Sequence, residues 1–213
     1  MRIVKEGYKF IGAAAALAVA AYVFVSPYMA VIPAVLAAFF TFFFRNPKRN
    51  IPDDNSVIVS PADGKVMKVV RLRNDDFVKQ SCVKITIFLS VFNVHVNRSP
   101  IKGEIKFQQY TCGRFRPAYK NSVGFENERH TIGIDNGKMR ITVTQIAGIL
   151  ARRIISWVTL NDRLTTGELY GLIKFGSCTE VVIPDNKNIE ILVKKGDKVV
   201  GGETIIGRIK NNE

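Results

Sequence analysis

The sequence contains few of the residues from which metal centres and disulfide frameworks are built. Its three cysteines, Cys82, Cys112 and Cys178, form no CxxC pair, and no histidine stands at metal-ligand spacing. We therefore expect neither a disulfide framework nor a metal site, and a reducing cytosolic setting fits best. Histidine is also scarce, because His95 and His130 are the only two imidazoles. This scarcity limits any scheme of acid–base catalysis to two candidate side chains.

Acidic residues are outnumbered, with 18 Asp and Glu against 31 Lys and Arg, which gives a net charge of +13. Such a charge suits nucleic acid, anionic lipid or an acidic small molecule, and alone it does not choose among them. The aromatic residues concentrate near the N-terminus and do not alternate with Lys and Arg along later segments, so we expect no nucleic-acid partner. A length of 213 residues suits one catalytic domain with an appendage.

Two uncharged apolar runs, Phe10–Val25 and Tyr28–Phe44, dominate the first fifth of the chain. Each is slightly shorter than the ~20 residues that usually span a bilayer. Basic residues flank the pair on both outer sides, which predicts a membrane hairpin over residues 1–50 with both ends in the cytoplasm. The second run and its immediate basic stop argue against a cleaved signal peptide. Pro27 and Pro33 leave open whether the hairpin spans or is re-entrant, and a buried hairpin of a soluble core is the remaining alternative.

Short β-rich runs bounded by turn residues follow from Ile51 onward, and no long amphipathic helix appears. Their composition predicts a mainly β catalytic domain over residues 51–213, built as a sandwich or barrel. Asn136-Gly137 is a strong signal for a type I′ hairpin turn. The predicted strands are Val57–Ser60, Lys65–Arg71, Val83–Leu89, Lys102–Gln109, Thr131–Ile134, Met139–Ile146, Val181–Ile183, Ile189–Val193 and Thr204–Lys210.

The C-terminal stretch NIEILVKKGDKVVGGETIIGRIK alternates short strands with Lys-Gly-Asp and Gly-Gly turns. This pattern resembles the hammerhead half of biotinyl and lipoyl carrier domains. A carrier displays its modified lysine in a Met-Lys-Met or Asp-Lys-Ala setting, which Lys195 and Lys198 lack. We therefore expect the fold of that half and not the carrier function.

Three places in the chain could carry chemistry. His95 lies where an apolar strand runs into the polar, Pro-terminated stretch of FLSVFNVHVNRSP, a placement at which catalytic groups are often displayed. Asp63 lies in the turn SPADGKV, and Gly176-Ser177 follows an apolar run. Each also has an ordinary structural interpretation, as a satisfied imidazole, a turn former and a common dipeptide. For His130 we expect only a structural role.

The order of these motifs resembles that of a known family. A hairpin closed by FFRNPKRNIP is followed by SPADGKV, FLSVFNVHVNRSP, NER, QIAGILARRI and GELYGLIKFGS, and then by the turn-rich tail GDKVVGGETI. In order and spacing, over nearly the whole chain, this resembles the short bacterial phosphatidylserine decarboxylases. The resemblance implies a pyruvoyl-dependent enzyme, made as an inactive proenzyme, that converts phosphatidylserine in the membrane to phosphatidylethanolamine and CO₂.

The resemblance also implies how the cofactor forms. Ser177 corresponds to the self-processing nucleophile of the family, and its hydroxyl is expected to attack the carbonyl of Gly176. Cleavage would give a β chain, residues 1–176, and an α chain, residues 177–213, with a covalent pyruvoyl group made from Ser177. Cys178 stands where the family commonly has Arg, which removes a cation beside the new N-terminus.

Further roles come from the same comparison of motifs. Asp63 and His95 correspond to the residues that activate the nucleophile, and whether His95 serves processing, decarboxylation or both stays open. Arg98, Arg152 and Arg153 are candidates for binding the lipid phosphate, because a guanidinium group can bind it bidentately. A solvated or interface-facing pair is an equally good interpretation of Arg152 and Arg153.

Three alternatives stay open at this point. One is a membrane-anchored, biotinyl-like lipid-binding module without catalysis, and another is a membrane serine hydrolase that works with Ser177 intact. The third is a decarboxylase of archaetidylserine, an ether lipid. The sequence also leaves the oligomeric state open, a homo-oligomer included.

Overall fold

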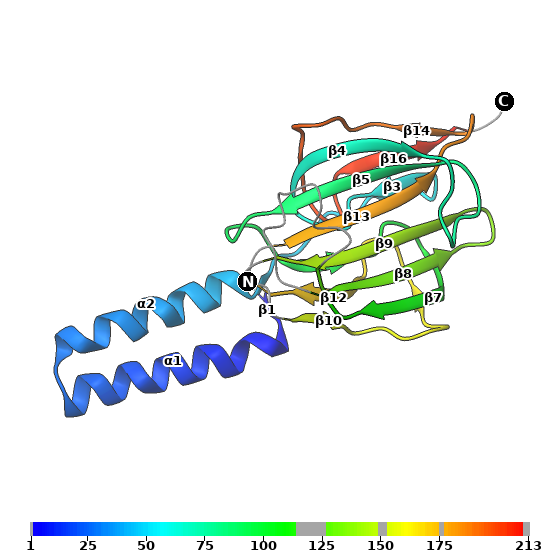
Figure 1. Cartoon of the computed structure of the whole chain (residues 1–213). Coiled ribbons are helices and arrows are strands. Elements are labelled where there is room, and N and C mark those ends of the chain that lie inside the picture. The colour runs from blue at the N-terminus through cyan, green and yellow to red at the C-terminus, as the bar shows by residue number, and fades with distance from the viewer. Residues whose placement is uncertain (1, 114–126, 149–152, 175–176, 211–213) are drawn as a thin grey trace. The chain divides into compact units, whose positions relative to one another are not determined.

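The computed structural model describes residues 2–113, 127–148, 153–174 and 177–210. The chain divides into two compact units, Met1–Lys48 and Arg49–Glu213. In their described parts the first unit contains two helices and the second contains strands without a helix (Figure 1). The expected combination of an N-terminal helix pair and a mainly β remainder is therefore confirmed.

The helical unit consists of α1 (Lys5–Phe24) and α2 (Pro27–Phe43), framed by the paired short strands β1 (Arg2–Ile3) and β2 (Arg45–Asn46). Between the helices, Ser26 caps α2 by accepting a hydrogen bond from the Met29 amide at 3.3 Å, and Pro27 begins the helix. A proline at this position loses no helical hydrogen bond and has the φ angle that a helix needs. The two helices therefore follow one another through a tight, well-capped connection.

Apolar side chains cover the outside of both helices. Val19 is 64% exposed, and Ile32 is 68% exposed. Within the described residues, α1 is the one helix long and apolar enough to cross a membrane, whereas α2 has 17 residues. Because exposed apolar surface of this kind is stable in lipid and costly in water, the helix pair favours membrane association.

The β unit is built of three antiparallel sheets. The largest has eight strands in the order β11-β7-β8-β9-β13-β5-β4-β15, and the two smaller sheets have the orders β10-β12-β6 and β14-β16-β3. The strands are β3 (Val57–Val59), β4 (Gly64–Leu72), β5 (Cys82–Leu89), β6 (Val96–Arg98), β7 (Gly103–Thr111), β8 (Arg129–Asp135), β9 (Arg140–Ala147), β10 (Ile154–Ser156), β11 (Arg163–Leu164), β12 (Leu169–Ile173), β13 (Ser177–Pro184), β14 (Ile189–Ile191), β15 (Lys198–Val199) and β16 (Ile205–Ile209).

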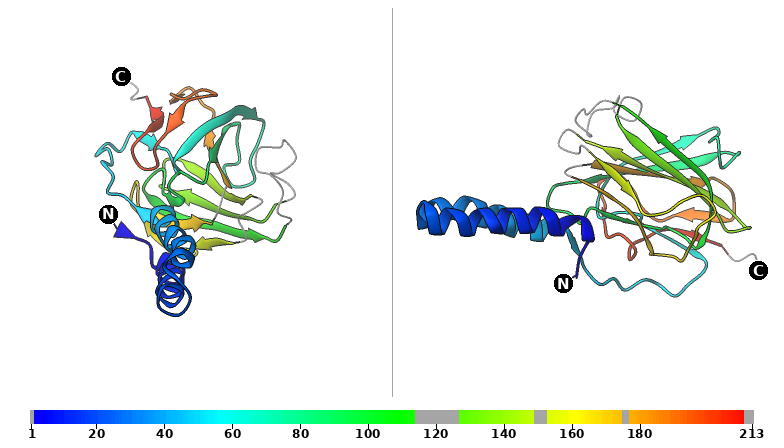
Figure 2. Two further views of the ribbon diagram at one scale, coloured as in Figure 1. Left: turned by 90° about the vertical axis from the view of Figure 1, so that its left-hand side faces the viewer. Right: turned by 90° about the horizontal axis from the view of Figure 1, so that it is seen from below.

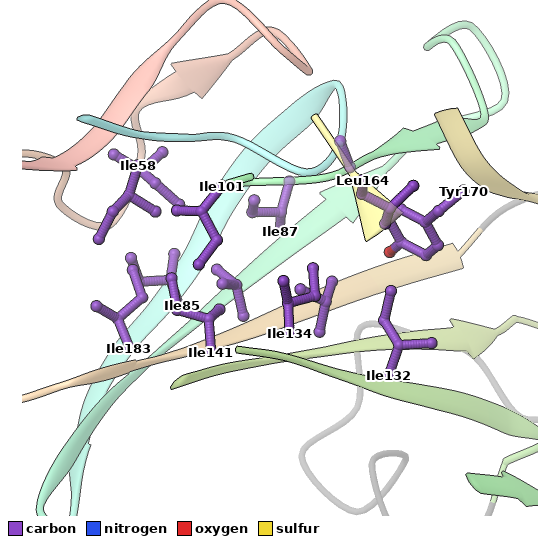
Figure 3. Close-up of a cluster of buried hydrophobic side chains, with 14 of the residues drawn as sticks. Ile58, Ile85, Ile87, Ile101, Ile132, Ile134, Ile141, Leu164, Tyr170 and Ile183 are labelled. Carbon is purple, nitrogen blue, oxygen red and sulfur yellow. The ribbon is translucent and has the colours of Figure 1, made fainter. Parts of the chain in front are cut away.

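The eight-stranded sheet curls into a half-barrel (Figures 1 and 2). Side chains alternate between the faces of a strand, and on β5 the alternate residues Ile85, Ile87 and Leu89 are fully buried. They join one large cluster of apolar side chains from most of the strands, with Ile58 at one end and Tyr170 at the other (Figure 3). This cluster is the main core of the unit, and it fixes the strands that carry the candidate site residues.

The structure confirms every strand predicted from the sequence and adds the short strands β6, β10, β11, β12 and β15. One detail of the prediction is wrong. The β8–β9 hairpin exists, but Asp135 pairs with Arg140, so that four residues form the loop. Gly137 has φ +80° whereas Asn136 has no positive φ, and a type I′ turn needs both. Asn136 Oδ1 instead accepts hydrogen bonds from the backbone amides of Lys138 and Met139.

Candidate active site

Asp63 is held rigidly in the turn between β3 and β4. Its Oδ1 accepts hydrogen bonds from the Gly201 amide at 2.8 Å and from Arg49 Nη2 at 2.9 Å, and Oδ2 lies 2.8 Å from the same nitrogen. A Cβ at Gly64 would lie 2.2 Å from the Phe88 carbonyl oxygen. Only glycine fits there, so the Asp-Gly pair of the turn is a structural requirement of the place where Asp63 lies.

Arg49 is a site residue that the sequence did not identify. Its side chain is 10% exposed and that of Asp63 is 16% exposed, so their ion pair is largely removed from water. The sequence assigned Arg49 only the role of a basic residue flanking the second apolar run. Because the guanidinium touches both carboxylate oxygens, Arg49 orients the Asp63 carboxylate as well as balancing its charge.

His95 is fully buried just before β6. Its Nδ1 lies 2.9 Å from the carbonyl oxygen of Asn93. A carbonyl can only accept, so Nδ1 carries a proton, and in the neutral imidazole Nε2 has the lone pair. The Asn93 side chain fixes this turn by accepting from the amide and hydroxyl of Ser90, at 2.9 and 2.8 Å. The turn therefore presents the imidazole with a basic Nε2, as a general base requires.

The backbone of Ser177 begins β13, a central strand of the eight-stranded sheet. Residue 177 is paired with Leu89 on β5 and with Ala147 on β9. Gly176 lies outside the described residues. The candidate cleavage point therefore coincides with the first residue of a strand that is bonded on both sides.

Strand β6 holds the Asp63 turn close to the segment of His95. The amide of Arg98 donates to the carbonyl of Pro61 at 2.9 Å, two residues before Asp63. The carbonyl of His95, at the other end of this short strand, accepts from the Ile173 amide at 3.1 Å. The turn of Asp63 is thus hydrogen-bonded to β6, and His95 directly precedes this three-residue strand.

The same strand also contacts β13. The Asn97 side chain donates from Nδ2 to Thr179 Oγ1 at 3.0 Å. Asn97 is two residues after His95, and Thr179 is two residues after Ser177. The structure therefore brings the segments of all three predicted catalytic residues to β6, although they lie far apart in the sequence.

Asn127 and Glu128, from the NER motif, hold the strand beside the candidate cleavage point. Asn127 Nδ2 donates to the carbonyl of Ala147 at 2.7 Å, and the Ala147 amide donates to the Glu128 carbonyl at 2.9 Å. Glu128 also accepts from the Ile154 amide at 3.3 Å. Because Ala147 is paired with Ser177, the motif supports the start of β13, a role that the sequence alone did not suggest.

The three candidate arginines lie in different surroundings. Arg98 is buried and donates from Nη1 to the Gly167 carbonyl at 2.9 Å. Burial, and then the neighbouring charge of Arg49, lower the pKa of Arg98. Arg153 is exposed, and Arg152 lies outside the described residues. The structure thus gives Arg98 a close structural contact and leaves Arg153 open to solvent.

The remaining titratable groups near the site are poor nucleophiles or bases. Burial raises the pKa of the Cys178 thiol to about 12, so it stays protonated and cannot compete with its neighbour Ser177. Burial lowers the pKa of His130, which is hydrogen-bonded inside the sheet and fits the structural role expected for it. Within the described ranges, no group of three or more His, Cys, Asp or Glu side chains could hold a metal ion.

Comparison with known proteins gives a consistent result. The family model for phosphatidylserine decarboxylase matches residues 36–207. The chain is 47% identical over 208 residues to the phosphatidylserine decarboxylase proenzyme of Symbiobacterium thermophilum, covering 97% of this chain and 95% of that protein. It is 45% identical over 206 residues to the proenzyme of the same name from Carboxydothermus hydrogenoformans, with 97% and 96% covered. A third relative, from Geotalea uraniireducens, is 39% identical over 206 residues, with 96% and 95% covered. The chain therefore belongs to the phosphatidylserine decarboxylase family.

Proposed function

We propose that this protein decarboxylates phosphatidylserine to phosphatidylethanolamine and CO₂, after cutting itself between Gly176 and Ser177. The observation that carries the proposal is the meeting of three segments at β6. The Asp63 turn is bonded to it, His95 precedes it, and Asn97 joins it to the strand that begins with Ser177. Membership of the phosphatidylserine decarboxylase family supports the reaction that we assign to these three segments.

Self-cleavage needs a base to activate a weak hydroxyl nucleophile. His95 Nε2 takes the proton of the Ser177 hydroxyl as its oxygen adds to the carbonyl carbon of Gly176. The imidazolium returns this proton to the nitrogen of residue 177 as the C–N bond breaks, which leaves an ester and a free amine. Loss of the Cα proton of residue 177 then expels the upstream chain as a carboxylate. The Asn93 carbonyl, bonded to Nδ1, orients the imidazole during this transfer, and Asp63, bonded to Arg49 and Gly201, remains our candidate for favouring the imidazolium form.

The pairing of β13 explains why cleavage need not separate the chains. Backbone pairs extend from Ser177 to Pro184 along β5 and from Ser177 to Val182 along β9. The later strand β16 also pairs with β3, and β15 pairs with β4. The α chain, residues 177–213, thus stays anchored in sheets that the β chain, residues 1–176, completes. Water can then hydrolyse the dehydroalanine at the new N-terminus in place, which gives a pyruvoyl group and releases ammonia.

The surroundings of the first residue of β13 fit such a group, because both neighbouring strands hold the backbone there. A pyruvoyl group supplies an electron sink for the loss of CO₂. His95 then delivers a proton to the former Cα of the lipid serine, since it is the imidazole of the motif that corresponds to the family's catalytic histidine. Arg98, Arg152 and Arg153 remain our candidates for the lipid phosphate.

The helical unit suits a substrate that stays in the bilayer. Residues 1–50 anchor the enzyme in the cell membrane, and the basic flanks place the catalytic domain, residues 51–213, on the cytoplasmic side. We also propose that the segment with β14, β15 and β16 follows the hammerhead pattern of biotinyl and lipoyl domains. Its support is the run of short strands separated by the Gly196 and Gly201-Gly202 turns.

The proposal is tested with purified full-length protein and vesicles that contain phosphatidylserine labelled at the serine carboxyl. We expect labelled CO₂ from the wild type, none from Ser177→Ala, and a decrease of about 10²- to 10⁴-fold for His95→Ala. Binding to vesicles without CO₂ would contradict the proposal and favour a lipid-binding module. Ester hydrolysis with Ser177 intact would favour a serine hydrolase, and CO₂ only from an ether-linked serine lipid would favour an archaetidylserine decarboxylase.

A further inference from the structure

A chain of hydrogen-bonded polar side chains, four of them buried and Gln108 half-buried, runs through the β unit. Gln108 Nε2 lies 3.0 Å from His130 Nε2, and His130 Nδ1 lies 3.3 Å from Gln145 Oε1. Gln145 Nε2 donates to Asn97 Oδ1 at 2.9 Å, and Asn97 Nδ2 donates to Thr179 Oγ1 at 3.0 Å. We call these five residues the polar chain.

All hydrogen bonds of the polar chain run in one direction. The Gln108 amide nitrogen can only donate, so His130 Nε2 accepts and its proton sits on Nδ1. Nδ1 donates to the Gln145 carbonyl oxygen, and each following amide uses its oxygen toward the preceding residue and its nitrogen toward the next. Thr179 is the final acceptor. A neutral His130 is what this arrangement requires, and burial lowers its pKa accordingly.

Burying the polar chain requires that its polar groups be hydrogen-bonded and that the neighbouring strand β12 pass close to it. Asn97, Gln145 and Thr179 are fully buried, and their polar groups would be costly there without partners. A Cβ at Gly171 would lie 2.9 Å from Gln145 Nε2 and 2.5 Å from the Ile155 carbonyl oxygen. Only glycine therefore lets β12 pass Gln145 so closely. Apolar side chains could fill the same space. Hydrogen bonds are directional, so a fully bonded polar chain fixes the relative positions of its strands as well as stabilising them.

The geometry that it fixes is the placement of β6 over β13. These strands belong to different sheets, so no backbone ladder between them sets their positions. Alternate positions of an extended chain share one face. The bond between Asn97 and Thr179 therefore joins β6 to β13 at positions two residues after His95 and two residues after the first residue of β13.

An independent set of contacts supports the same placement. The His95 carbonyl accepts from the Ile173 amide. Ile173 packs with Ala147 in a small buried apolar cluster, and Ala147 is the partner of Ser177 across the sheet. The polar contact through Asn97 and the apolar contact through Ile173 therefore both connect the segment of His95 to the beginning of β13.

We propose that Asn97 and Thr179 are positioning residues for self-cleavage, which hold the segment of His95 against β13 through their mutual hydrogen bond. The inference rests on the proposed function, because it concerns the same cleavage. Asn97 and Thr179 act through the segment of His95 and the backbone of β13. Their contribution is the distance and angle between the base and the hydroxyl, to which proton transfer is sensitive.

The test compares Thr179→Val, which keeps the shape of the side chain and removes the acceptor, with Thr179→Ser, which keeps the hydroxyl. Cleavage of newly synthesised full-length precursor is followed over time by intact mass, and the melting temperature of each variant is measured in parallel. We expect Thr179→Val to slow cleavage about 10- to 100-fold, since a displacement near 1 Å has an effect of this size. Thr179→Ser should remain close to the wild-type rate.

A matched control removes a hydroxyl pair elsewhere on the same sheet. Thr144→Val breaks the 3.0 Å contact between Thr144 and Thr131, and it should leave the cleavage rate unchanged. In the fraction of Thr179→Val that has been cut, kcat for decarboxylation should fall while KM stays the same. A side chain with a merely structural role would lower the melting temperature without this separation of kcat from KM.

Asn97→Ala and the double variant Asn97→Ala/Thr179→Val complete the design. If the bond carries the effect, the double variant cleaves no more slowly than the slower single variant. If the wild type and Thr179→Val are both cleaved, and at the same rate, the inference is overturned and the proposed function is unaffected. A wild-type chain that stays uncut overturns both. A Thr179→Val chain that fails to fold is replaced by the Asn97→Ala time course, for which a wild-type rate also overturns the inference.

Discussion

The two units of this protein distribute apolar and polar side chains in opposite ways. The helical unit exposes large apolar residues such as Leu17, Val23 and Ile32. The β unit instead buries polar residues, among them His95 and Asn97, inside an otherwise apolar core. Lipid stabilises the first arrangement, whereas only a complete set of hydrogen bonds stabilises the second. The difference separates a unit suited to the membrane from a unit suited to chemistry.

The largest effect is expected in the helical unit, from a charge placed on its exposed apolar surface. Leu17 is 60% exposed on α1, and Leu17→Asp replaces a favourable residue in lipid by an unfavourable one. The difference is about 3 to 4 kcal/mol near the centre of a membrane helix. Sedimentation with vesicles should show strongly reduced binding. Leu192→Asp, at an exposed leucine of the β unit, is the control, and an equal loss from both variants would contradict the comparison.

The next effect concerns the ion pair of Arg49 and Asp63. Arg49→Met leaves the Asp63 carboxylate in a largely buried place with the Gly201 amide as its remaining bond. Losing one partner of such a pair should lower the free energy of unfolding by about 3 kcal/mol, which denaturant titration measures. Arg208→Met breaks the exposed pair with Asp54 and should have no measurable effect. Equal stability of the two variants would show that the first pair is not protected from water.

A smaller effect, of opposite sign, is expected at Tyr170. Its hydroxyl is buried and has no hydrogen-bond partner among the described residues, and burial raises its pKa. Tyr170→Phe removes the unsatisfied group and should increase the free energy of unfolding by about 1 kcal/mol. Tyr110→Phe, which removes a hydrogen bond to Glu128, should bring no gain. A loss of stability in Tyr170→Phe would mean that the hydroxyl has a partner.

The smallest effect is a dependence of stability on pH through His130. Its pKa in the folded protein is lower than the ordinary value of 6.5, so the unfolded chain binds the proton more tightly. The contribution of neutral His130 is therefore complete above pH 6.5 and is lost as the pH falls through the folded pKa. Melting temperatures between pH 8 and pH 5 should decrease more in the wild type than in His130→Asn. Parallel curves would contradict a neutral His130 in the polar chain.

The sequence predicted those parts of the structure that local pattern determines. Runs of β-branched residues revealed the long strands, and two uncharged runs revealed the helices. The start of β13 was placed at Val181, because Ser177, Cys178 and Thr179 lack an apolar pattern. Pairing with two neighbouring strands makes these residues a strand, and no local signal reports such pairing.

The candidate site was predictable only in part, for the same physical reason. Asp63, His95 and Ser177 stand in motifs that a family resemblance identifies. Arg49 contacts Asp63, and Asn97 contacts Thr179, only because the fold brings these residues together. Asn97 meets Thr179 across 82 positions of the sequence, so its role became visible only when β6 and β13 were seen in contact.

The most direct test of the account is the intact mass of the mature protein under denaturing conditions. Self-cleavage predicts two chains, residues 1–176 and a smaller chain from residue 177 that begins with a pyruvoyl group and resists Edman sequencing, whereas Ser177→Ala remains one chain. A single uncut chain in a preparation that releases CO₂ from phosphatidylserine would contradict it.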